Sequence, residues 1–243
     1  MASRYSFDWS SLDRQTLFDS MYSINDKIVN KSLRISRFHS LVSQHIKTFL
    51  PIRIQKYLDL KVKNNQVYVG GTYCSYSDKK KTKSITVNYN YNPYDKYLKI
   101  SQKKFEKQCI LFADTVLHEI IHMRQFRRRG FKEIVGYNST AEKTKQRREQ
   151  SYLGHPDEIG AYSFNIACEL NDKFKGNSKK IIAYLNESSK IKLKSGNCWT
   201  MYLKAFDYKH THPIIKRLKK RVIYYITKEQ FNKPYLCKDW ISN

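Results

Sequence analysis

The feature that most constrains the fold is the pentad His118-Glu119-Ile120-Ile121-His122. On an α-helix, residues four apart project from the same face, so both imidazoles can meet one Zn²⁺ at ~2.0–2.1 Å. Glu119 is rotated by about 100° from His118 and does not bind the metal directly. Its carboxylate can instead reach water at the metal and accept a proton from it. The pentad therefore predicts a helix with a zinc site on one face.

The surrounding residues support a helix from Ser101 to about Arg129. An apolar stripe of period 3.6 is formed by Ala113, Val116, Leu117, Ile120 and Ile121. Three arginines at 127–129 suit the negative end of the helix dipole, and Gly130 can supply a left-handed cap. The alternative is a solvated helix face without metal, but an unpaired Glu119 among apolar neighbours would be costly.

A catalytic zinc needs a third protein ligand and an open fourth position. Glu158, near the start of the helix that we expect from about Asp157, is the preferred candidate. The alternative is that Asp157 and Glu158 only complement a helix N-terminus, which we favour for Asp157 as the cap residue. His155, three residues before Glu158, is the competing ligand.

The periodicity along the chain predicts an α+β fold. Helical spacing indicates helices within 11–49, at 101–129, from 157 onward, and at 178–188, 197–206 and 213–227. Alternation of apolar and polar residues indicates three strands, Ile52–Val62, Gln66–Ser77 and Ile85–Tyr91. We expect helices, a small antiparallel sheet, and then helices again.

Composition excludes several classes of protein. The N-terminus lacks the apolar stretch of a signal peptide, and no segment approaches the ~20 apolar residues of a membrane-spanning helix. The five cysteines are far apart and include no C-x-x-C pair, so neither a disulfide framework nor a cysteine-rich zinc ribbon is expected. We therefore expect no membrane association and a cytoplasmic location, or the host cytoplasm or virion if the chain is encoded by a bacteriophage.

The charge balance indicates what kind of partner the chain could bind. The chain has 46 Lys and Arg against 21 Asp and Glu, a net charge of +25. Basic runs occur at 79–83, 127–129 and 216–221, and tyrosines near the first run could stack on bases. These features predict contact with nucleic acid or another polyanion. The alternatives are solvated basic faces, strand tyrosines that only pack, and a lysine-rich codon bias.

The segments His118–His122 and Glu158-Ile-Gly-Ala-Tyr162 together resemble minimal gluzincin metallopeptidases. That resemblance implies zinc held by His118, His122 and Glu158. The stretch from Gly71 to Tyr76, then Ser84 to Asn88, then the pentad also resembles the SprT-like (Spartan) proteases. Their pattern uses a histidine after a glycine as third ligand, which Gly154-His155 would match. The two resemblances cover roughly residues 66–170.

The resemblance also implies a substrate strand and an oxyanion donor. The strand Ser84–Tyr91 would be an edge strand that pairs with an extended peptide, unless it is an ordinary member of the sheet. Tyr162 and His212 are the candidate oxyanion donors. Thr211-His212-Pro213 is similar to a segment of CAAX-protease and HtpX-type metallopeptidases, and the alternative for His212 is a residue at a helix entry.

We therefore expect a single zincin-like domain over 1–243, with a helical extension at 1–50, a metallopeptidase core at 52–175 and a basic helical part at 176–243. The expected activity is zinc-dependent hydrolysis of peptide bonds, with Glu119 as the general base and a protein or peptide as substrate. The alternative is a basic nucleic-acid-associated or phage virion structural protein with a vestigial or structural metal site. A catalytic zinc would keep an open position, whereas a structural zinc would be closed by a fourth ligand such as His155.

Overall fold

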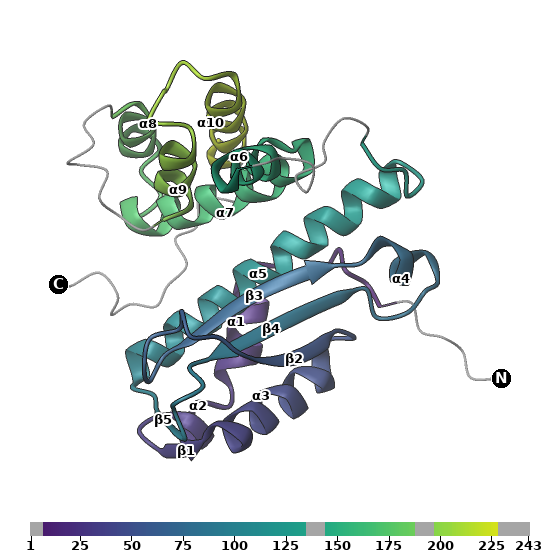
Figure 1. Cartoon of the computed structure of the whole chain (residues 1–243), viewed down its shortest axis with the longest axis vertical. Coiled ribbons are helices and arrows are strands. Elements are labelled where there is room, and N and C mark those ends of the chain that lie inside the picture. Colours follow the sequence, from purple (N-terminus) through teal and green to yellow (C-terminus); the bar gives the residue numbers. More distant parts are fainter. Residues whose placement is uncertain (1–6, 135–143, 188–196, 228–243) are drawn as a thin grey trace. The chain divides into compact units, whose positions relative to one another are not determined.

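The computed structural model of the chain describes residues 7–134, 144–187 and 197–227. The chain divides into two compact units, 1–131 and 132–243, and each is described by itself. The described helices and strands are labelled in Figure 1. They are α1 (Arg14–Tyr22), α2 (Asn25–Ile28), β1 (Ser32–Arg34), α3 (Ile35–Phe49), β2 (Arg53–Leu58), β3 (Val67–Tyr73), α4 (Ser75–Lys79), β4 (Ile85–Tyr91), β5 (Tyr97–Lys99), α5 (Gln102–Arg128), α6 (Lys145–Gly154), α7 (Pro156–Phe174), α8 (Ser178–Asn186), α9 (Cys198–Ala205) and α10 (Pro213–Ile226).

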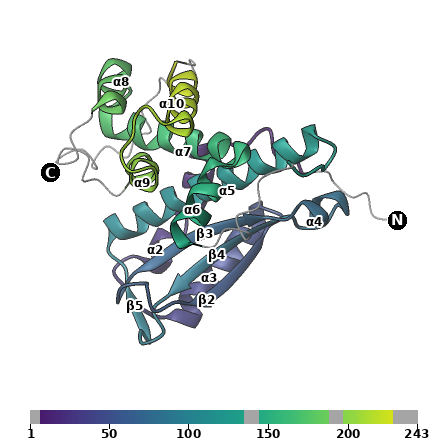
Figure 2. The same ribbon diagram turned by 45° about the horizontal axis from the view of Figure 1, so that its top comes forward.

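The first unit contains a three-stranded sheet in the order β2-β4-β3 (Figure 2). Strand β4 pairs antiparallel with β3 but parallel with β2, so the sheet is mixed. The prediction of an antiparallel sheet was therefore wrong for β2. The physical reason is that β2 and β3 do not form a hairpin: β4 lies between them and takes the hydrogen bonds of both. A second, two-stranded sheet joins β1 and β5.

One face of the sheet is buried and the other is more open. Along β4, the side chains of Ile85, Val87, Tyr89 and Tyr91 are buried and alternate with half-buried polar residues. This is the alternation expected for a strand with one face on a core. The pairing puts Val67, Val69 and Gly71 of β3 opposite β4 residues of the buried set, on the same face.

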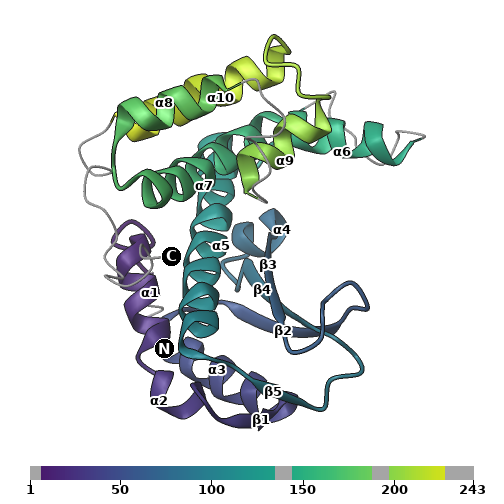
Figure 3. The same cartoon turned by 90° about the vertical axis from the view of Figure 1, so that its left-hand side faces the viewer.

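Helix α5 is the long element of this unit and carries the pentad. It lies between α1 on one side and the strands on the other (Figure 3), with β3 its main partner in the sheet. Its boundaries agree with the predicted helix at 101–129. Gly130 follows with a φ of 61°, and the N–H of Phe131 donates to the carbonyl of Phe126 at 2.8 Å. The predicted left-handed cap at Gly130 is therefore confirmed.

The second unit, as far as it is described, is helical. Its apolar core includes Ile159, Ile166, Trp199 and Leu218, all fully buried. Helix α7 packs against α6, α8, α9 and α10. Because α7 touches all four other helices, it is the central element of this unit, and Glu158 lies in its first turn.

The structure confirms the predicted α+β class, with three strands and the major helices close to their expected positions. The short strands β1 and β5 and the short helices α2 and α4 were not predicted, because segments of three to five residues give no usable periodicity. The boundary between the two units falls inside the expected core at 52–175. A zincin-like topology and a single domain stay predictions. In the described residues, no helix has the length and apolar character needed to span a membrane.

Candidate metal centre

His118 and His122 lie one turn apart on α5, as their spacing predicts. Both are buried, with exposed fractions of 9% and 8%, and their Nε2 atoms are 3.1 Å apart. Two nitrogens bound to one tetrahedral Zn²⁺ at ~2.0–2.1 Å would be separated by roughly 3.3 Å. The separation of these two nitrogens therefore fits two ligands of one zinc ion.

The ring of His122 is oriented by a residue of the same helix. Its Nδ1 atom lies 3.1 Å from Oε1 of Gln125. If Nδ1 carries the proton and donates to this amide oxygen, Nε2 keeps a lone pair directed away from Gln125. Outer partners of this kind fix the tautomer and the ring orientation of metal-binding histidines. Gln125 thus prepares His122 to bind metal through Nε2.

Glu119 is buried against the edge of the sheet. Its exposed fraction is 6%, and it lies beside Gly71 of β3. A Cβ atom added at Gly71 would stand 2.8 Å from Oε1 of Glu119 and 2.6 Å from Cγ2 of Thr115. Only glycine therefore lets β3 approach α5 so closely at this point. The carboxylate of Glu119 is held between a helix and a strand, one residue from His118.

Glu158 is half-buried in the first turn of α7 and has tyrosines around it within the second unit. Desolvation is the largest cause that raises the pKa of Tyr152 far above its ordinary value, followed by the charge of Glu158 and by Tyr162; hydrogen bonds to both residues add to the rise. Burial raises the pKa of Tyr202 as well, again with a contribution from Glu158. The raised pKa keeps the hydroxyl of Tyr152 neutral, so it can donate a hydrogen bond to Glu158.

His155 and His212 have the same structural role at the starts of two helices. Each precedes a proline at the first helical position and is the N-cap residue. The Nδ1 atom of His155 accepts from the backbone N–H of Asp157, and that of His212 accepts from Ile214, both at 3.2 Å. The N-cap is therefore His155, and the prediction that Asp157 is the cap was wrong. For His212, this geometry agrees with the helix-entry alternative, and its ring lies tilted against the ring of Phe206, with centroids 4.6 Å apart.

The predicted ligands are His118 and His122 of the first unit and Glu158 of the second, which could together hold one metal ion; that these three bind one ion stays a prediction. The two histidines are buried and Glu158 is half-buried. Two imidazoles and one carboxylate are a donor set that suits zinc among other divalent metals. In the described residues His155 and His212 are not members of such a group.

Comparison with known proteins gave no match: no family model fits the chain, and neither the curated proteins nor the solved structures include one similar to it. The resemblance to gluzincin and SprT-like proteases stays a prediction based on the residues quoted above.

Sequence reasoning missed three residues of this region. Gln125 follows His122 by three positions, which is the spacing of neighbours on a helix face. Its contact with His122 could therefore have been predicted from the sequence. The pair Gly70-Gly71 within a strand is a known sign of close approach by another backbone or helix. The contact between Tyr152 and Glu158 had no such signal, because it depends on how α6 packs against α7.

Proposed function

We propose that the chain is a zinc-dependent metallopeptidase. The observation that carries this proposal is the arrangement on α5: two buried histidine nitrogens 3.1 Å apart, with the buried carboxylate of Glu119 one residue away and against β3. A purely structural metal site would not need an additional buried carboxylate beside its ligands. Hydrolysis needs such a carboxylate, because attacking water must lose a proton.

Each residue has a defined task in this proposal. His118, His122 and Glu158 would hold the zinc, and Gln125 and Tyr152 would orient two of these ligands. Zinc bound there would supply a Lewis acid that acidifies water and polarises a peptide carbonyl.

Glu119 would accept a proton on its carboxylate from the attacking water and deliver it to the leaving amine. Its position supports this task, because it follows His118 directly on α5 and its side chain is buried beside Gly71 of β3. Tyr162, near Tyr152 in the second unit, stays the candidate donor to the developing oxyanion.

The strand that would bind substrate differs from the expected one. Strand β4 is the central strand of the sheet, so both of its edges are already paired. The expectation that Ser84–Tyr91 is an edge strand was therefore wrong. Among the described strands of this sheet, β3 has one unpaired edge and lies against α5. A peptide added along β3 would pass Gly71, where Glu119 lies.

The test combines metal content with proteolysis. The purified wild-type protein should bind about one zinc per chain, and His118→Ala and Glu158→Ala should each lose it. Glu119→Gln should keep zinc but lower the rate of casein hydrolysis by at least about 10³-fold, since the proton acceptor is gone. Glu149→Gln, an exposed glutamate on α6, is the matched control and should behave as wild type.

Two outcomes would contradict the proposal. Normal hydrolysis by Glu119→Gln would exclude this residue as the base. Failure of the wild-type protein to bind zinc, even after reconstitution, would exclude the metallopeptidase and favour a vestigial site.

A further inference from the structure

A cavity of about 690 Å³ lies in the first unit, away from the two histidines. Its walls come from the segment between β2 and β3, the start of β3 and the first half of α5. The lining residues that the argument uses are Lys61, Lys63, Tyr68, Lys104, Lys107 and Gln108. This volume is within the range of sites that bind small ligands or side chains of a partner.

The cavity is strongly positive. Four lysines line it, all exposed, against one aspartate, Asp59. The Oδ1 atom of Asp59 accepts a hydrogen bond from the backbone N–H of Lys61 at 2.9 Å. The ammonium group of Lys104 donates to the backbone carbonyl of Asn65 at 3.4 Å. In the described residues none of the four ammonium groups forms an ion pair with a carboxylate. Four like charges around one cavity attract an anionic ligand.

A second, independent observation indicates a ligand. Gln108 lines the cavity, has an exposed fraction of only 6%, and its Oε1 atom has no hydrogen-bond partner in the described structure. A buried amide oxygen without a partner costs free energy. A ligand that donates an N–H group to Gln108 would satisfy it, and a peptide backbone has such groups.

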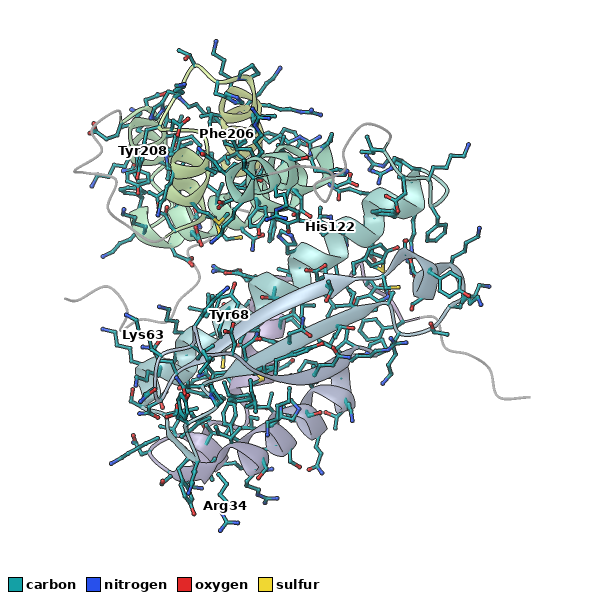
Figure 4. All side chains as sticks on the ribbon, viewed as in Figure 1. Arg34, Lys63, Tyr68, His122, Phe206 and Tyr208 are labelled. Atoms are coloured by element: carbon teal, nitrogen blue, oxygen red, sulfur yellow. The ribbon has the colours of Figure 1, made fainter. Side chains whose placement is uncertain are left out.

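The cavity and Glu119 lie along the same face of α5 and along the same strand, β3. Positions 108, 111, 115 and 119 of α5 are three or four residues apart and share one face of the helix. Gln108 and Leu111 line the cavity, whereas Thr115 and Glu119 face Gly71. On β3, Tyr68 lines the cavity three residues before Gly71, a distance of about 10 Å along a strand. In Figure 4, Lys63 and Tyr68 lie near the start of β3, and His122 lies further along α5.

We propose that this cavity binds acidic side chains of an extended peptide substrate, about three to four residues from the bond that is cleaved. The inference rests on the proposed function for the position of the cleaved bond. Charge favours an acidic ligand, the unpaired edge of β3 favours an extended peptide, and Gln108 accepts a backbone N–H. The chain would thus select acidic segments of proteins.

The first test is binding, which needs no catalysis. A fluorescein-labelled peptide with an Asp-Asp-Glu segment is titrated with the zinc-loaded Glu119→Gln protein, beside the same peptide with Asn-Asn-Gln. The acidic peptide should bind about tenfold more tightly at low salt, and this difference should shrink at high salt. Lys104→Gln/Lys107→Gln should abolish the difference. Lys216→Gln/Lys220→Gln on α10 makes the same change in net charge at exposed sites and should preserve it.

The second test is cleavage of quenched peptides by the enzyme with Glu119 intact. The acidic peptide should be cleaved with a kcat/KM about tenfold higher than the neutral one, and Lys104→Gln/Lys107→Gln should lose only this advantage. Gln108→Leu should weaken binding of both peptides alike, because it removes an acceptor of backbone N–H groups.

The outcomes separate the two proposals. Equal binding and equal cleavage of the two peptides would overturn the binding site for acidic side chains and leave the metallopeptidase proposal standing. Lysine-dependent binding without cleavage of any peptide would leave this binding site standing and overturn the metallopeptidase proposal. If a single-stranded oligonucleotide binds more tightly than the acidic peptide and depends more strongly on Lys104 and Lys107, the cavity is a nucleic-acid site and the peptide inference is wrong.

Discussion

At the scale of the residue, Gly71 controls the position of Glu119. Replacement by Ala would put a Cβ atom within 3 Å of both Thr115 and Glu119. We expect Gly71→Ala to destabilise the first unit by about 1–3 kcal/mol, because β3 and α5 must move apart. Hydrolysis should fall more than zinc content, since the added methyl group meets the side chain of Glu119, whereas neither histidine is among its nearest neighbours. Chemical denaturation and zinc analysis measure the two effects.

The neighbouring glycine supplies the control. A Cβ atom at Gly70 would meet only the ring of Tyr68, at 3.6 Å, which is an ordinary contact. We expect Gly70→Ala to be neutral or to stabilise by up to about 1 kcal/mol through the unfolded chain. Equal destabilisation by both substitutions would show that strand flexibility, and not the contact with Glu119, explains the glycine pair.

At the scale of the element, a buried ion pair joins α1 to α5. Arg14 and Asp114 are 4% and 8% exposed, and the guanidinium donates to both carboxylate oxygens, at 2.6 and 2.9 Å. We expect Arg14→Met to cost about 3–5 kcal/mol, because it leaves the charge of Asp114 buried without its guanidinium. Arg14→Met/Asp114→Leu should recover most of this loss. Urea denaturation of the wild-type protein and these two variants measures the loss and its recovery.

A loss below about 1 kcal/mol in Arg14→Met would contradict this account, since that is the value of an exposed pair. The chain also offers a second Arg–Asp ion pair for comparison, in which the arginine is more exposed. Arg127 and Asp78 also form two hydrogen bonds, at 2.5 and 2.7 Å, but the Arg127 side chain is 47% exposed. Asp78 is itself only 5% exposed, but it keeps a hydrogen bond from the hydroxyl of Tyr73 at 2.9 Å. Loss of Arg127 should therefore cost less than loss of Arg14, because the buried carboxylate retains a donor.

At the scale of the whole molecule, each unit contains a histidine that resists protonation. Burial, followed by Lys56 and Lys47, lowers the pKa of His39 in the first unit below the ordinary 6.5. Burial and then Lys219 lower the pKa of His210 in the second. The unfolded chain takes up these protons more readily, so stability is complete above pH 6.5 and is lost as pH falls toward the folded pKa.

We therefore expect the thermal midpoint to fall as the pH drops below about 6.5. His39→Gln and His210→Gln should each reduce this fall, because glutamine does not titrate. Differential scanning calorimetry at several pH values measures it. An unchanged slope in both variants would show that other groups cause the acid sensitivity. Glutamine can keep the contact of His39 with the hydroxyl of Tyr91, now 3.2 Å long, so a loss of packing should not obscure the result.

The sequence by itself determined the periodic and local features of this protein. The helix that carries His118, Glu119 and His122, its cap at Gly130 and strand β4 all follow from spacing within one segment, which backbone geometry converts directly into structure. The net charge of +25 also comes from the sequence alone, and the predicted affinity for polyanions stays a prediction.

Only the tertiary structure decided which segments meet. The place of β4 between β2 and β3, the fit of Gly71 against Glu119 and the gathering of four lysines around one cavity join segments far apart in the chain. No local propensity encodes such pairings, because they depend on which apolar faces cover one another when the core forms. His155 and His212 show the converse. The sequence suggested His155 as a competing zinc ligand and His212 as an oxyanion donor or a helix-entry residue, and in the structure the Nδ1 atoms of both cap helices.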